Sequence, residues 1–188
     1  MEIKELIEIS LAEAKDEPDG GTSQRIIHQN RSKNFVESLS SKMREHYKNS
    51  RNIFVLSKHS EHHRREFGLN ELLFDILVCE TDQVISSDKK KNLTFVTKAI
   101  WQIESEFARN SREALYDFNK LVLGASENKL FIGPQVSNQD GYLKTLEKPA
   151  RHCDSNTYVA LVPHPSEWKR KSLEVHLWIF RDGWEEIL

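Results

Sequence analysis

The chain has 188 residues, a net charge of −2 at pH 7 and a hydrophobic fraction of 38%, which fits one globular domain, or one domain with an appendage. The near-neutral charge excludes a uniformly basic surface that coats nucleic acid, although a local basic groove is compatible with it. No apolar run approaches the roughly eighteen residues that a membrane-spanning helix needs, so we expect no membrane partner.

Cysteine usage and the first residues of the chain favour a reducing compartment. Cys79 and Cys153 lie far apart in the sequence, and residues 1–5 lack the basic and apolar regions of a signal peptide. We therefore expect free thiols and a cytoplasmic protein.

The N-terminal segment predicts a helix that is separate from the rest of the chain. Apolar residues recur at helical spacing over 2–16, and a run of helix-breaking residues follows at 17–21. We expect residues 1–21 to form an N-terminal helix or arm with a linker. Residues 22–188 are then expected to form an α/β domain with a C-terminal strand extension.

The next segments predict one helix followed by three strands. The helix is expected over 23–48, and the first strand over 52–56. Two further strands are expected at 72–79 and 94–107, joined by a polar loop from about 82 to 92.

A helix over 111–123, with Ser111 as its N-cap and Gly124 closing it, leads into a short apolar strand at 129–132. This strand-helix-strand spacing suits a crossover connection and hence parallel strands. The remainder predicts one more helix and two more strands, at 137–148, 157–162 and 174–180.

Acidic side chains lie inside two of the predicted strands. Asp75 interrupts the apolar run 72–78, and Gln102, Glu104 and Glu106 alternate with large apolar residues. Alternate residues of a strand share one face, and adjacent carboxylates repel each other unless they are solvated or bind a cation. The pattern therefore predicts a hard-metal site on two neighbouring strands. The alternative is a strand whose polar face is simply solvated.

The predicted elements place Asp75 in the second strand and Glu104-Ser105-Glu106 in the third. A helix around 114–121 and a strand at 129–133 follow. In this order and spacing, residues 23–133 resemble the PD-(D/E)xK nuclease superfamily, which has the restriction-endonuclease-like fold. The superfamily motif usually ends in lysine, where this chain has Glu106. Some restriction enzymes of the superfamily are similar to this chain in carrying an acidic residue there.

The resemblance implies an α/β fold with a mixed sheet flanked by helices, and metal-dependent hydrolysis of nucleic-acid phosphodiesters, with DNA as the favoured substrate. Mg²⁺ or Mn²⁺ would be held by Asp75 and Glu104, and Glu106 would orient or deprotonate the attacking water. Lys120 is a candidate to replace the motif lysine, although it also fits an ordinary solvated helix residue. Glu71 is either an extension of the site or a charge at a strand start.

Several alternatives remain open from the sequence alone. A non-catalytic nucleic-acid-binding or assembly module on the same fold would explain the missing motif lysine, and the C-terminal strands are candidates for a homodimer face. His59 with His62 or His63 has helical spacing suited to zinc, but it lies in a highly charged stretch that fits a polar loop.

Overall fold

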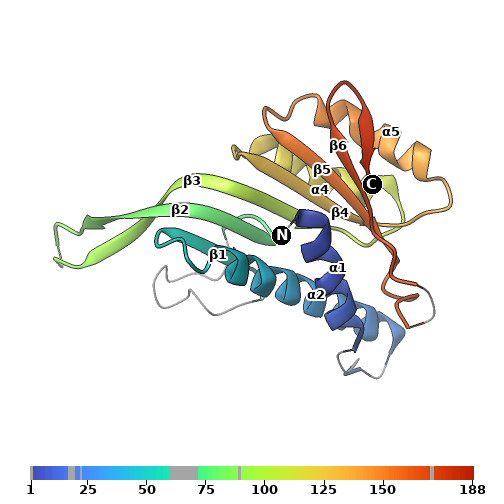
Figure 1. The fold of residues 1–188 in the computed structure, drawn as a ribbon, viewed down its shortest axis with the longest axis horizontal. Coiled ribbons are helices and arrows are strands. Elements are labelled where there is room, and N and C mark those ends of the chain that lie inside the picture. The colour runs from blue at the N-terminus through green and yellow to red at the C-terminus, as the bar shows by residue number, and fades with distance from the viewer. Residues whose placement is uncertain (1, 17–19, 22, 60–71, 89, 170–171) are drawn as a thin grey trace.

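Seven strands form one open sheet in the order β1-β2-β3-β4-β5-β6-β7 in the computed structural model of the chain (Figure 1). The structure describes residues 2–16, 20–21, 23–59, 72–88, 90–169 and 172–188. The strands are β1 Ile53–Ser57, β2 Ile76–Ile85, β3 Asn92–Ser105, β4 Asn128–Pro134, β5 Asn156–Val162, β6 His176–Phe180 and β7 Trp184–Ile187. The helices are α1 Ile3–Asp16, α2 Gln24–Tyr47, α4 Ser111–Leu123 and α5 Gln139–Ala150. The predicted α/β class, with a mixed sheet flanked by helices, is confirmed.

The sheet is antiparallel at both sides and parallel in the middle. Strands β1, β2 and β3 pair antiparallel, β3, β4 and β5 pair parallel, and β6 and β7 again pair antiparallel. Helix α4 connects β3 to β4, so the predicted crossover between parallel strands is confirmed.

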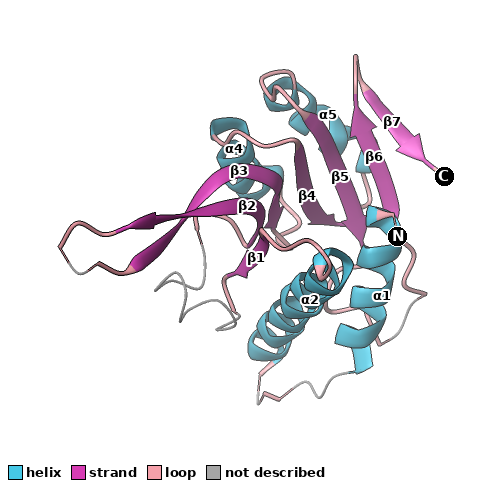
Figure 2. Cartoon of the chain, turned by 60° about the vertical axis from the view of Figure 1, so that its left-hand side comes forward, coloured by secondary structure: helices cyan, strands magenta, loops and turns pink. Residues whose placement is uncertain are grey.

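Helices cover both faces of the sheet (Figure 2). Helices α1 and α2 bury one face, where Phe35 and Leu39 pack with Ile103 and other strand residues. Helices α4 and α5 bury the other face, where Phe118 packs with Phe131. The apolar faces of each helix pair therefore pack on one face of the sheet, and the domain has two hydrophobic cores.

The N-terminal helix belongs to the first of these cores. Its apolar stripe, Leu6, Ile7 and Leu11, is almost completely buried together with residues of α2 and the sheet. The segment that the sequence suggested as an arm thus packs on α2 and helps to cover the sheet. None of the helices within the described ranges is long and apolar enough to cross a membrane.

Some predicted boundaries were wrong. Strand β2 begins at Ile76 and continues to Ile85, so the first part of the segment expected as a polar loop at 82–92 pairs with β3 in a β-hairpin, and residues 86–91 connect the two strands. This outer part of the hairpin is exposed, and its polar composition reflects solvent on both faces rather than the absence of strand (Figure 1). Strand β7, only four residues long, was missed.

Candidate functional site

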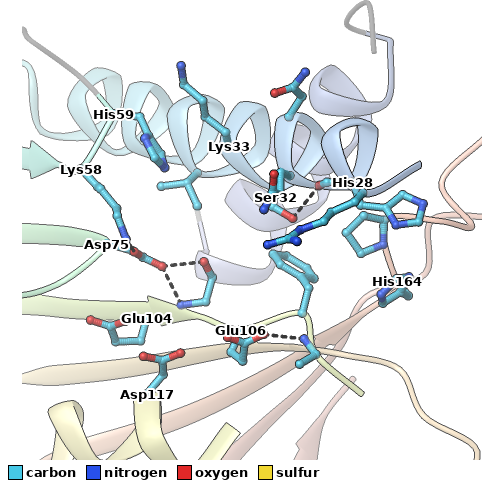
Figure 3. Close-up of a pocket in the computed structure, with 18 of the residues that line it drawn as sticks. His28, Ser32, Lys33, Lys58, His59, Asp75, Glu104, Glu106, Asp117 and His164 are labelled. Atoms are coloured by element: carbon cyan, nitrogen blue, oxygen red, sulfur yellow. Dashed lines mark hydrogen bonds and ion pairs between the residues drawn. The ribbon is translucent and has the colours of Figure 1, made fainter. Parts of the chain in front are cut away.

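The three predicted carboxylates line one cleft of about 1000 Å³ (Figure 3). The side chains of Asp75, Glu104 and Glu106 lie along one wall, at the point where β2 begins and β3 ends. The N-terminal half of α2 forms the opposite wall. Strands β2 and β3 are neighbours, as the sequence predicted, and this pairing brings the carboxylates of distant segments together.

Asp75 is fixed to the end of β3 by two hydrogen bonds. Ile76 pairs with Ile103, so Asp75, one residue earlier, meets the last residues of β3. Its Oδ2 accepts hydrogen bonds from the backbone N–H of Ser105 at 3.0 Å and from the Ser105 hydroxyl at 2.7 Å. The Nζ of Lys58 lies 3.7 Å from the other carboxylate oxygen, Oδ1. These contacts hold an acidic side chain in place at the sheet end.

Glu104 forms the floor of the cleft. Its side chain is 1% exposed, and Oε2 accepts a hydrogen bond from Lys120 Nζ at 3.1 Å. Its other oxygen, Oε1, is buried and has no hydrogen-bond partner among the described residues. Burial raises the pKa of Glu104 to about 8, and the charge of Asp75 adds to this effect, whereas Lys120 opposes it.

Lys120 reaches the cleft from α4 and joins two carboxylates. Its Nζ lies 3.1 Å from Glu104 and 2.7 Å from Asp117. Partial burial disfavours its charge, but the hydrogen bond that Lys120 donates to Asp117 and the negative charge of Glu104 outweigh burial and raise the pKa of Lys120. The ammonium group is therefore held beside the buried carboxylate, although the Lys120 side chain as a whole is 45% exposed.

Asp117 is a residue of the cleft that sequence reasoning missed. It stands three residues before Lys120 on α4, and this spacing is common on solvated helix faces. The i,i+3 spacing of Asp117 and Lys120 was therefore visible in the sequence, but it is also the spacing of an ordinary surface ion pair. Only the parallel pairing of β3 with β4, which α4 connects, shows that this pair lies over Glu104.

Glu106 lies just beyond the end of β3. Its backbone N–H donates to the carbonyl of Ile132 at 3.0 Å, and its carboxylate accepts the N–H of Ala108 at 2.5 Å. Burial raises the pKa of Glu106, the Ala108 hydrogen bond opposes this, and Asp117 raises the pKa further. A carboxylate whose pKa is raised is a stronger base than a solvated one.

A further candidate residue, Gln102, lies away from the described cleft. Gln102 points to the same side of the sheet as Glu104 but is fixed further along: its amide donates to the carbonyl of Ala125 at 3.1 Å and accepts from the Ser126 hydroxyl at 3.2 Å. Gln102, which the sequence offered as a possible site residue, does not line this cleft, and its hydrogen bonds attach the α4–β4 connection to β3. Glu71 lies outside the described residues.

The histidine alternative is only partly described. His59 lines the cleft, whereas His62 and His63 lie outside the described residues. Burial lowers the pKa of His59, so the neutral form of the ring is favoured.

The donor set of the cleft suits a hard divalent cation. Glu104 Oε1 is a buried acceptor without a partner among the residues that the structure describes, Asp75 lies beside it, and both supply carboxylate oxygens. In the described ranges, no three His, Cys, Asp or Glu side chains are arranged so as to hold a metal between them. Mg²⁺ needs fewer, because it usually takes one or two carboxylates and completes its shell with water and substrate phosphate.

Replacing Glu104 by glutamine should stabilise the metal-free fold more at pH 8 than at pH 5. The folded state keeps the Glu104 proton to about pH 8, whereas the unfolded chain releases it near 4.5, so stability falls as pH rises through this window. The glutamine of the variant does not titrate. The unfolding free energy of the variant minus that of wild type should therefore grow by roughly 3 kcal/mol from pH 5 to pH 8, because each pKa unit is worth about 1.4 kcal/mol.

Urea unfolding in EDTA measures this difference, with Glu8→Gln on the exposed face of α1 as the matched control. An advantage of Glu104→Gln that is the same at both pH values would show that Glu104 is ionised throughout.

The chain matches no protein-family model, no curated protein and no solved structure. The geometry of the cleft and the resemblance seen in the sequence are therefore the grounds on which its function is inferred.

Proposed function

We propose that the cleft hydrolyses phosphodiester bonds of nucleic acid with Mg²⁺ or Mn²⁺ as cofactor. The observation that carries the proposal is Glu104: a buried carboxylate with an unpartnered oxygen, beside Asp75 and in contact with a lysine. Burying such a carboxylate costs stability unless a cation compensates for it, and Lys120 contacts only one of its two oxygens.

Asp75 and Glu104 would hold the divalent ion. Bound there, the ion would supply a Lewis acid for the phosphoryl oxygen and a water of lowered pKa. Glu106, whose own pKa is raised, is suited to orient that water and accept its proton. The Ser105 hydrogen bonds to Asp75 keep this carboxylate aimed at the cleft.

Lys120 would supply the positive charge that the motif lysine gives in the superfamily. The side chain arrives from α4 rather than from β3, yet its ammonium group contacts Glu104 directly. A fixed cation near the reacting phosphate stabilises the charge that develops in the transition state. DNA is the substrate that the superfamily resemblance favours.

One observation favours a second candidate, a non-catalytic nucleic-acid-binding or assembly module on the same fold. Position 106 carries Glu where the motif usually has Lys, and the cation at the site is engaged by two carboxylates, Glu104 and Asp117. In this account the ion pair with Lys120 would stabilise the fold and do no chemistry.

A cleavage assay separates the two candidates. Purified protein is incubated with plasmid and with single-stranded and duplex oligonucleotides in Mg²⁺, Mn²⁺ or EDTA, and products are resolved on denaturing gels. Cleavage in either metal and none in EDTA supports the proposal. Binding without cleavage favours the non-catalytic module, and the absence of both would reject both nucleic-acid functions.

A further inference from the structure

We infer that the nucleic acid enters this cleft as a single strand, whose phosphates are contacted by α2. The inference rests on the proposed function, because it concerns the substrate of the same site. It follows from three properties of the cleft: its shape, the rigidity of its walls, and the charge of the wall opposite the carboxylates.

One face of α2 lines the cleft along three helical turns. The residues on this face recur every three or four positions and are Arg25, His28, Gln29, Ser32, Lys33 and Val36. At 1.5 Å per residue this face is about 16 Å long, which matches a few nucleotides of a strand. Figure 3 shows the helix running above Asp75, Glu104 and Glu106.

The cleft is too confined for a duplex. Its volume of about 1000 Å³ lies at the upper end of the range of sites that hold small ligands. The acidic groups lie deep within it, since the side chain of Asp75 is 13% exposed and that of Glu104 is 1% exposed. A phosphate can reach them only if its strand passes between α2 and the sheet end, which requires separation from a complementary strand.

The α2 wall is packed tightly against the rest of the domain. The guanidinium of Arg31 donates to the carbonyl of Pro165 at 2.5 Å, and Phe35 contacts the rings of Phe107 and Trp168 edge to face. Trp168 itself is fully buried and donates to the carbonyl of Pro163. Widening the cleft for a duplex would break these contacts.

Cations on the α2 wall are available to phosphates. Arg25 is exposed and forms no ion pair within the described part of the chain. Lys33 is half exposed, and its Nζ lies 3.9 Å from Glu37, a pair too long and too exposed to hold it strongly. Contacts from such side chains to phosphates bind nucleic acid without regard to sequence.

Binding measured in EDTA tests the inference independently of hydrolysis. Fluorescence anisotropy compares a labelled single strand and a duplex of the same sequence, using wild type and the double variant Arg25→Ala/Lys33→Ala. The variant should bind the single strand at least tenfold more weakly. Its salt dependence should be shallower by about 1.4, because each phosphate contact on a single strand contributes about 0.7 to the slope. Lys144→Ala/Lys148→Ala, on the exposed face of α5, is the matched control.

Cleavage then tests the form of the substrate. In Mg²⁺, a single strand or a single-stranded tail on a duplex should be cut at least tenfold faster than the blunt duplex. Equal cleavage of the duplex, or unchanged binding by the α2 variant, would overturn the inference while leaving metal-dependent hydrolysis intact. Loss of single-strand binding in the α2 variant, with no cleavage by wild type, would support the α2 contact and reject the proposed hydrolysis.

Discussion

Replacing Glu104 by glutamine is expected to lower the rate of metal-dependent cleavage by about 100- to 1000-fold, the loss typical when a single charge-stabilising group is removed from an active site. Glutamine keeps the shape of the side chain but removes the charge that would hold the ion beside Asp75. Nucleic-acid binding should persist, because the cationic contacts lie on the opposite wall of the cleft.

Single-turnover cleavage and anisotropy measure the two effects on the same preparation. Glu8→Gln, an equally conservative change on α1, should cleave like wild type. If Glu104→Gln instead cleaved at the wild-type rate, Glu104 would be a buried structural carboxylate, and the proposed role of the cleft floor would be lost.

Removing the Lys120 side chain is expected to cost about 100-fold or more in cleavage, in the range found for single groups that stabilise developing charge. Lys120→Ala takes away the only cation that contacts Glu104 among the described residues. The pKa of Glu104 should then rise further, since Lys120 at present opposes the effect of burial. The pH at which cleavage is half maximal should therefore move upward, which a purely structural role would not produce.

A lysine placed at position 106 tests whether the position of the cation in the cleft matters. Glu106→Lys restores the residue that the superfamily motif usually has, and cleavage retained by that variant would show that position 106 accepts either chemistry. Glu106→Lys combined with Lys120→Ala tests whether a lysine at position 106 can replace Lys120, and activity above that of Lys120→Ala alone would show that the cation matters more than the Glu106 carboxylate. Lys148→Ala on α5 serves as the control. Wild-type cleavage by Lys120→Ala, with an unshifted pH profile, would assign the ion pair to fold stability only.

The sequence predicted the carboxylates of the cleft better than its lysine. Asp75 inside an apolar run and the alternation around Glu104 are local signals, and strand pairing follows from them because one face of each strand must be buried. Lys120 and Asp117 are different, since their spacing on α4 is that of any surface pair. Their role depends on the β3–α4–β4 crossover, which is a tertiary feature.

Strand boundaries show a similar limit. The buried half of β2 was found because its residues are apolar, whereas the exposed half was taken for a loop. In that exposed half the backbone is held by the ladder with β3, which pairs Gln83 with Thr94 and Val84 with Leu93. Apolar composition indicates which strand residues are buried. A hairpin that is exposed to solvent on both faces has few apolar residues, so its strands are hard to recognise from sequence.

Binding of Mn²⁺ tests the central claim most directly, because the account requires Asp75 and Glu104 to share a divalent ion. Electron paramagnetic resonance counts free and bound Mn²⁺ in wild type, in Asp75→Asn/Glu104→Gln and in the control Glu8→Gln. We expect weak binding by wild type and by the control, and loss of that binding in the double variant. Equal Mn²⁺ binding by wild type and the double variant would contradict it.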